Sequence, residues 1–244
     1  MKKELCIENF EGALIAQELG YDSIELNSAL CLGGLTPSLG LVRKVSENVD
    51  LEIICMIRNR ACGFNYSDLE YEEMLSELDI FLDENIAGIV FGFLTSDFKI
   101  DVEKTLKFVE KIHSRNKIAV FHRAIDNVEN YEDGIKTLID LKVDRVLTSG
   151  QEETAIEGIE KLKNIQLKYG NSIEIIAGSG LNSSNVEEFV SKTNINYLHS
   201  TCKEFREDIT TANKVSYSIY SDKTNSFQVT SYEEAKKFAE AVDK

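Results

Sequence analysis

Titratable side chains recur at the ends of short apolar runs along this chain. Arg58 follows the run EIICMI, His122 closes the run KIAVFH, and His199 lies near the end of the run INYLHS. Imidazole, guanidinium and carboxylate groups that converge on one place can transfer protons and hold an anion. The candidate catalytic residues are Glu25, Arg58, His122, Asp126 and His199. A structural alternative for Glu25 is an ion pair with Arg58 on the next apolar run.

Small residues follow three of the later apolar runs, as TSG, GSG and HST. Glycine tolerates positive φ and allows a ligand to approach the backbone, where N–H groups can bind a phosphate. A tight turn explains the same residues equally well. The candidate anion-binding residues are Ser149, Gly178, Ser179, Gly180 and Ser200.

The chain has five cysteines. Their number is odd and none forms a CxxC pair, which disfavours both a disulfide framework and a structural zinc site. Near the N-terminus, Glu4 and Glu8 stand where a secretion signal would be apolar. We therefore expect a cytoplasmic protein in which most cysteines are reduced and two or three of them are small core residues.

Residues with these roles need a scaffold, and the hydrophobic pattern predicts one. Short β-branched runs alternate with amphipathic stretches of helical spacing, such as VEKTLKFVEKIHS at 102–114. The predicted strands are LCI near residue 6 and the runs at 23–26, 52–57, 88–92, 117–122, 144–150, 172–180 and 195–200. Alternation of this kind indicates parallel strands joined by crossover helices.

Eight such units in 244 residues favour a single (β/α)8 TIM-type barrel over an open sheet, which would normally carry GxGxxG after its first strand. We expect one domain over residues 1–244, with a long polar loop at about 201–231 and a final helix at about 232–243. In such a barrel the carboxyl ends of the strands form the site. The candidate residues occupy those ends, so we expect Glu25, Arg58, His122 and His199 to face one cavity.

The charge of the chain excludes two classes of function. Its formal net charge is −15 and its isoelectric point is near 4.7. Nucleic-acid binding and attachment to an anionic membrane both need a basic surface. No apolar run is long enough to span a membrane. The expected partner is therefore a small molecule or an ion.

Several motifs together resemble the CutC family of copper homeostasis proteins. They are, in order, ELNSALCLGGLTPS, MIRNRACGFNYSD, FHRAID, RVLTSGQ, AGSG and HST. The resemblance covers roughly residues 4–201, and the segments GGLTPS and FHRAID are its most specific parts. It implies a TIM-type barrel in the cytoplasm, a role in copper handling with Cu(I) bound by cysteines, and a homodimer or larger homo-oligomer.

The resemblance also identifies candidate metal ligands. In metal-binding members of the family, a cysteine pair lies at the ends of the first two strands. Cys6 matches the first position, whereas Asn27 stands at the second and is a poor ligand for Cu(I). Cys31, four residues further on, can take its place, so the predicted metal ligands are Cys6 and Cys31.

Two functions from different classes remain open at this point. The first is a cytoplasmic CutC-like copper homeostasis protein that binds Cu(I). The second is a TIM-barrel enzyme, an isomerase, lyase or hydrolase, acting on a small phosphorylated or carboxylated metabolite. The resemblance and Cys6 favour the first, and the polar strand ends favour the second. The fold hosts too many chemistries to decide between them.

Overall fold

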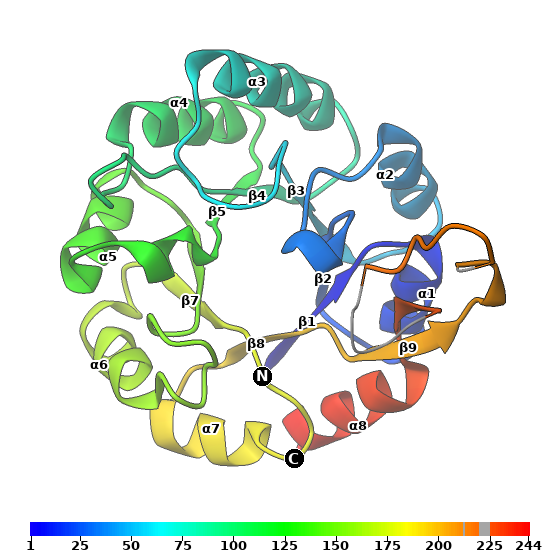
Figure 1. Ribbon diagram of the computed structural model, residues 1–244. Coiled ribbons are helices and arrows are strands. Elements are labelled where there is room, and N and C mark those ends of the chain that lie inside the picture. Colours follow the sequence, from blue (N-terminus) through cyan, green and yellow to red (C-terminus); the bar gives the residue numbers. More distant parts are fainter. Residues whose placement is uncertain (212, 220–224) are drawn as a thin grey trace.

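The computed structural model describes residues 1–211, 213–219 and 225–244 and contains a closed barrel of eight parallel strands (Figure 1). The strands are β1 (Lys2–Ile7), β2 (Ser23–Leu26), β3 (Glu52–Met56), β4 (Gly88–Phe91), β5 (Ile118–Phe121), β6 (Arg145–Thr148), β7 (Glu174–Ala177) and β8 (Tyr197–Ser200). They follow one another around the barrel in chain order, and β8 pairs with β1 to close it. The predicted fold class is confirmed.

A ring of helices surrounds the barrel (Figure 1). The helices are α1 (Phe10–Glu18), α2 (Leu39–Ser46), α3 (Asp68–Leu82), α4 (Val102–His113), α5 (Tyr131–Asp140), α6 (Ile159–Tyr169), α7 (Val186–Thr193) and α8 (Tyr232–Val242). Polar caps begin most of them, as where the Asp101 side chain accepts a hydrogen bond from the Lys104 N–H. One face of α4 is apolar and packs against the strands through the buried residues Phe108, Val109 and Ile112.

The two halves of the barrel interior differ in polarity. From β3 to β7 the inward side chains in the middle of the barrel and toward its carboxyl end are apolar, as Ile54, Met56, Val90, Val120, Leu147 and Ile176, whereas Glu52, Arg145 and Glu174 form ion pairs at the amino ends of their strands. The inward side chains of β1, β2 and β8 include buried polar and charged groups, which are Glu4, Cys6, Ser23, Glu25, Tyr197 and His199. Burying charges is costly unless they are paired or used, so this half is where chemistry is expected.

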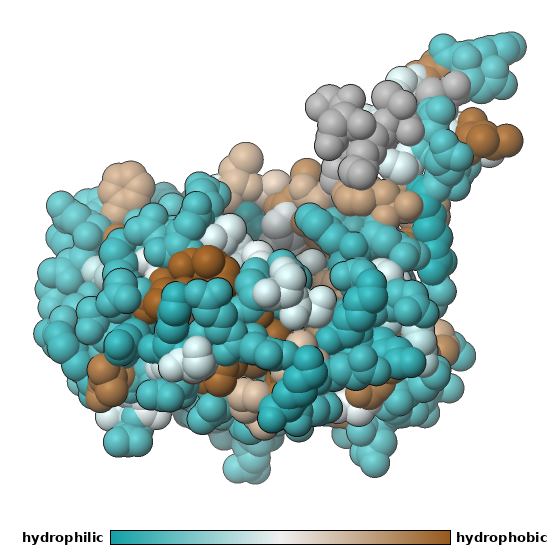
Figure 2. All heavy atoms as spheres, turned by 90° about the horizontal axis from the view of Figure 1, so that it is seen from below, coloured by the Kyte–Doolittle hydropathy of each residue, from teal (hydrophilic) through white to brown (hydrophobic). Residues whose placement is uncertain are grey.

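The segment between β8 and α8 differs from the loop predicted at 201–231. Its described residues include β9 (Lys203–Glu207) and β10 (Ser226–Thr230), which pair as an antiparallel ribbon, while residues 212 and 220–224 lie outside the described part. The ribbon strands are short and largely polar, which hides them from a hydrophobic pattern. Figure 2 shows part of this segment projecting from the rounded body. Apolar side chains are exposed there, among them Ile209, Val215 and Tyr217.

None of the helices within the described ranges is both long enough and apolar enough to span a membrane.

Candidate functional site

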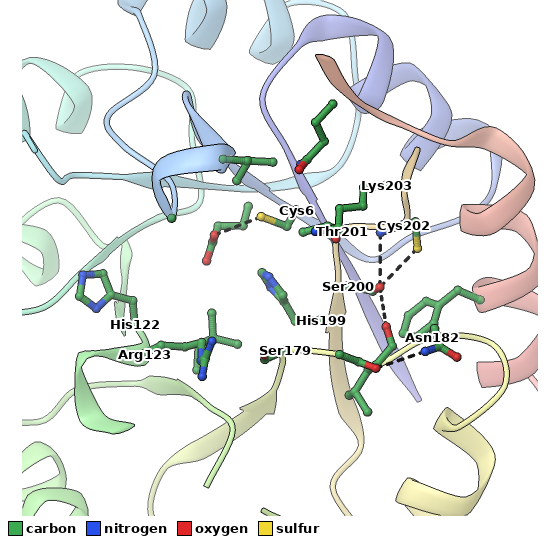
Figure 3. A pocket seen from close by; sticks show the side chains of 18 of the residues that line it. Cys6, His122, Arg123, Ser179, Asn182, His199, Ser200, Thr201, Cys202 and Lys203 are labelled. Carbon is green, nitrogen blue, oxygen red and sulfur yellow. Dashed lines mark hydrogen bonds between the residues drawn. The ribbon is translucent and has the colours of Figure 1, made fainter. Parts of the chain in front are cut away.

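A cavity of about 500 Å³ opens at the carboxyl ends of the strands (Figure 3). Four of the five candidate catalytic residues line it, namely Glu25, Arg58, His122 and His199. The structure thus brings these four to one place, on β2 and β8 and just after β3 and β5. Ser179, Gly180 and Ser200, from the predicted anion-binding set, line the same cavity.

Strand register builds a compact group of side chains at the polar side of the cavity. Cys6 on β1 pairs with Glu25 on β2, and Glu4, two residues before Cys6, pairs with His199 on β8. Residues two apart on a strand face the same side, so all four point into the barrel. One potential ligand atom from each of Cys6, Glu25 and His199 lies within 4.8 Å of the others.

Hydrogen bonds fix this group. The Cys6 thiol donates to Glu25 Oε1 (3.5 Å), and Asn27 Nδ2 donates to both Glu25 Oε1 (2.9 Å) and Cys6 Sγ (3.4 Å). Nδ1 of His199 lies 2.9 Å from Glu4 Oε1. The other ring nitrogen of His199, Nε2, has no hydrogen-bond partner among the described residues.

Burial sets the protonation of the same group. Burial, reinforced by the carboxylates of Glu25 and Glu4, raises the pKa of the Cys6 thiol well above its usual range. Burial also raises the pKa of Glu25, although His199 opposes that shift. For His199, burial disfavours the charged ring, but Glu25 and Glu4 outweigh it and raise its pKa. The protonation state of each of these three groups therefore depends on the charge of the others. Such coupling is typical of sites that bind a cation or exchange a proton.

Arg58 does not pair with Glu25, the structural alternative that the sequence left open. Its guanidinium instead donates to the carbonyl oxygens of Gly33 (3.1 Å), Gly34 (3.0 Å) and Cys62 (2.7 Å). It forms no ion pair with any described residue, although it is only 5% exposed. Arg58 therefore ties two loops together and leaves a buried positive charge at the cavity.

His122 sits on the opposite wall from Cys6, with Phe64 over its ring at 4.9 Å between centroids. The Ala124 N–H donates to His122 Nδ1 (3.1 Å), so Nε2 carries the hydrogen of the neutral ring. That Nε2 is buried without a partner in the described part of the chain. Burial, and secondly the charge of Arg58, lower the pKa of His122 to about 3.

The predicted catalytic Asp126 is not among the residues that line the cavity. It lies in η2 (Arg123–Asn127), where its carboxylate accepts hydrogen bonds from the backbone of Ser149 and Gln151 and from the Thr148 hydroxyl. Ser149, a predicted anion-binding residue, is also absent from the lining, because its N–H and hydroxyl both donate to Asp126. Both residues support the loop after β6.

Asp126→Asn is expected to reduce stability and leave metal binding at Cys6 unchanged. The new amide N–H₂ would face hydrogen-bond donors, so the free energy of unfolding should fall by about 2 kcal/mol. Denaturant unfolding at neutral pH measures this, with the exposed Asp50→Asn as the matched control. Loss of metal binding at unchanged stability would instead place Asp126 in the site.

Arg123, which alternation predicts to face the helices, lines the cavity. Strand β5 ends at Phe121 and η2 begins at Arg123, so strand alternation stops before this residue. Arg123 Nε donates to Asp126 (3.0 Å) and Nη2 donates to the Ser149 hydroxyl (2.7 Å). Asp126 and Ser149 thus hold the guanidinium at the cavity.

The other predicted anion-binding residues have distinct roles. The Gly178 N–H already donates to the Thr148 carbonyl (3.2 Å). A Cβ on Gly178 would lie 2.8 Å from Leu147 Cδ1 and 3.2 Å from His199 Cδ2, so this glycine makes room for both side chains. The Ser200 hydroxyl donates to the Leu181 carbonyl (2.8 Å). Ser179 and Gly180 have positive φ, of 79° and 73°. The left-handed backbone of these two residues forms a turn that lines the cavity.

Cys31, the second predicted metal ligand, is not brought to Cys6. It lies in the short helix η1 (Leu30–Leu32), and its neighbours Leu30 and Gly33 line the cavity while Cys31 does not. The loop is fixed in this arrangement by the Arg58 hydrogen bonds to Gly33 and Gly34. The residues that accompany Cys6 are Glu25 and His199.

Sequence reasoning overlooked Glu4 and Asn27 as members of the site. Glu4 is two residues before Cys6 on the same inward face, a signal that the sequence does contain. Asn27 is recognisable only by its place in the family's cysteine position, and its contact with the Cys6 thiol requires the strand register.

Comparison with known proteins gives one consistent result. The CutC family model matches residues 1–204. A family protein CutC of Treponema denticola is 41% identical over 220 residues, which are 90% of this chain and 88% of the relative. A copper homeostasis protein cutC homolog of Caenorhabditis elegans is 35% identical over 97% of this chain and 93% of its own. The crystal structure of a copper homeostasis protein CutC from Streptococcus agalactiae superposes with a TM-score of 0.77 at 27% identity, over 82% of this chain and 98% of that one.

Proposed function

Because the chain belongs to the CutC family, we propose that it is a copper homeostasis protein that binds one Cu(I) ion as cargo at Cys6 and His199. The observation that carries this proposal is the buried group of Cys6, Glu25 and His199, whose ligand atoms lie within 4.8 Å of one another beside an open cavity. The cavity gives the ion a path to the group.

The donor set suits this cargo. Thiolate sulfur is the donor that Cu(I) prefers, and imidazole nitrogen is a good second donor. His199 Nδ1 is engaged by Glu4, which leaves Nε2 as the ligand atom and orients the ring. Carboxylate support of this kind is typical of metal-binding histidines.

His199 replaces the second cysteine that the family resemblance implies. Asn27 occupies that cysteine's position, and its Nδ2 donates a hydrogen bond to the Cys6 sulfur, so it positions the thiol instead of binding the ion. The Cys6 thiol is held protonated, so binding must release its proton. Glu25 Oε1, which accepts the thiol hydrogen bond, is placed to receive that proton.

The proposal includes a cytoplasmic location. All five cysteines are unpaired in the part of the chain that the structure describes. Free cysteines are typical of a reducing compartment, where copper is held as Cu(I).

The test is anaerobic titration with Cu(I) against a chelator, followed by copper X-ray absorption of the loaded protein. We expect one ion per chain, with one sulfur and one lighter donor atom in its coordination shell. A shell of two or three sulfurs would overturn the assignment of His199, because it would require a second cysteine. Binding that does not saturate at one ion per chain would overturn the proposal itself.

A further inference from the structure

We propose that the same cavity holds a second site, which binds the phosphate group of a small metabolite between Arg123 and the loop from Ser179 to Leu181. This site goes beyond the copper proposal and does not rest on it. Nothing in it involves Cys6.

The first argument is the direction of the peptide groups after β7. The Ser179 carbonyl accepts a hydrogen bond from the Ala155 N–H (2.9 Å), and the Gly180 carbonyl accepts one from Asn185 Nδ2 (2.9 Å). In a trans peptide the N–H of the next residue points the opposite way. The N–H groups of Gly180 and Leu181 are therefore directed away from these supports.

These N–H groups have no acceptor in the part of the chain that the structure describes. Within the described residues, the N–H groups of Ser179, Gly180, Leu181 and Thr201 make no hydrogen bond, and all four residues line the cavity. The positive φ of Ser179, unusual for a residue with a side chain, is part of what turns the backbone in this way. Successive free N–H groups form an anion-binding concavity.

The second argument is the placement of Arg123. Its Nη2 donates to the Glu152 carbonyl (3.3 Å), while the Ser179 hydroxyl donates to the carbonyl of the next residue, Glu153 (2.7 Å). Arg123 and Ser179 therefore meet the same short stretch of chain and are neighbours, as Figure 3 also shows. Nη1 of Arg123 has no partner among the described residues and remains for a ligand.

An independent observation points to an anion in this cavity. Arg58 lines it, is only 5% exposed and forms no ion pair within the described ranges, and its Nε is buried without a partner. A buried charge without a counter-charge is costly, and an anionic ligand in the cavity would lower that cost.

The number of donors selects the ligand class. Three or four backbone N–H groups and a guanidinium use all of the roughly four acceptor positions of a carboxylate or more, whereas the three terminal oxygens of a phosphate monoester can accept from all of them. A cavity of about 500 Å³ leaves space for a small metabolite beyond the phosphate. Glu25 and His199 line the same cavity, so they are available to contact the rest of the bound metabolite.

The test is a ¹H–¹⁵N NMR titration of metal-free Cys6→Ser protein with inorganic phosphate, glycerol phosphate and acetate. Because this protein lacks the proposed copper ligand, success or failure here is separate from that of the copper proposal. We expect saturable shifts at the amides of Ser179, Gly180, Leu181 and Thr201, with both phosphates but not with acetate. Shifts scattered over the surface, or equal effects of acetate, would overturn the proposal.

A variant pair completes the test. Arg123→Gln should weaken glycerol phosphate binding about tenfold or more, the loss of one charge-assisted contact. Arg43→Gln, on the outer helix α2, removes the same charge far from the cavity and should leave binding unchanged. Equal affinities of the two variants for glycerol phosphate would show that Arg123 does not contribute to the site. If Arg123→Gln does not fold, the amide shifts of the parent protein still decide the question.

Discussion

Replacement of Cys6 by serine is expected to lower the affinity for Cu(I) by about a hundredfold or more, which corresponds to at least about 3 kcal/mol. A serine hydroxyl is a hard donor that stays protonated, so it cannot replace a thiolate toward a soft ion. The fold should tolerate the change, since the new hydroxyl can keep the hydrogen bonds with Glu25 and Asn27. Anaerobic competition with a Cu(I) chelator measures the difference.

The other cysteines supply matched controls for this result. Cys55 and Cys202 are buried thiols, and neither belongs to the group around Cys6. Cys55→Ser and Cys202→Ser should therefore leave the affinity within about threefold. Cys31→Ser separates the two assignments of the second ligand, because it should have a small effect if His199 completes the site. Similar small losses in all four variants would show that Cu(I) binds without a defined site.

The fold could be predicted because its signals are local. Each strand is a short β-branched run and each helix an amphipathic stretch, so their alternation alone requires parallel strands and crossover helices. The ribbon of β9 and β10 could not be predicted in the same way. Its strands are short and largely polar, as in Lys203–Glu207, and their pairing joins segments about twenty residues apart.

Some members of the candidate site could be predicted from the sequence, but their contacts could not. Strand ends and alternation suffice to place Glu25, Arg58, His122 and His199 at one cavity. The grouping of Cys6 with Glu25 and His199 depends on the register between β1, β2 and β8, which no local pattern contains. Hydrogen-bond partners are non-local as well.

Asp126 and Arg123 illustrate the same limit. Both belong to a distinctive motif, FHRAID, and alternation directs the arginine outward. The short helix η2 begins at Arg123, so strand alternation no longer applies there. Arg123 therefore reaches the cavity, and Asp126 contacts the guanidinium without lining the cavity itself. A motif therefore identified the right segment, whereas the roles within it required the backbone path.

Acidification is expected to destabilise the protein through His122. Its pKa in the folded protein is about 3, against an ordinary value of 6.5, because burial and then Arg58 disfavour the charged ring. Between these two values the unfolded chain binds a proton at this residue that the folded protein does not bind. The free energy of unfolding should therefore fall by about 1.4 kcal/mol per pH unit below pH 6.5, or roughly 3 kcal/mol by pH 4.

His122→Asn isolates this contribution. The asparagine side-chain oxygen can still accept the Ala124 N–H, which preserves the start of η2, but the side chain no longer titrates. Other acid-sensitive groups, such as Glu25 and His199, are present in both proteins and cancel in the comparison. At pH 7.5 the ring is neutral in folded and unfolded chains alike, so any difference there measures only the changed packing. Denaturant unfolding from pH 7.5 to 4 should then show a flatter decline in the variant, whereas parallel curves would mean that the His122 ring takes up its proton in the folded state.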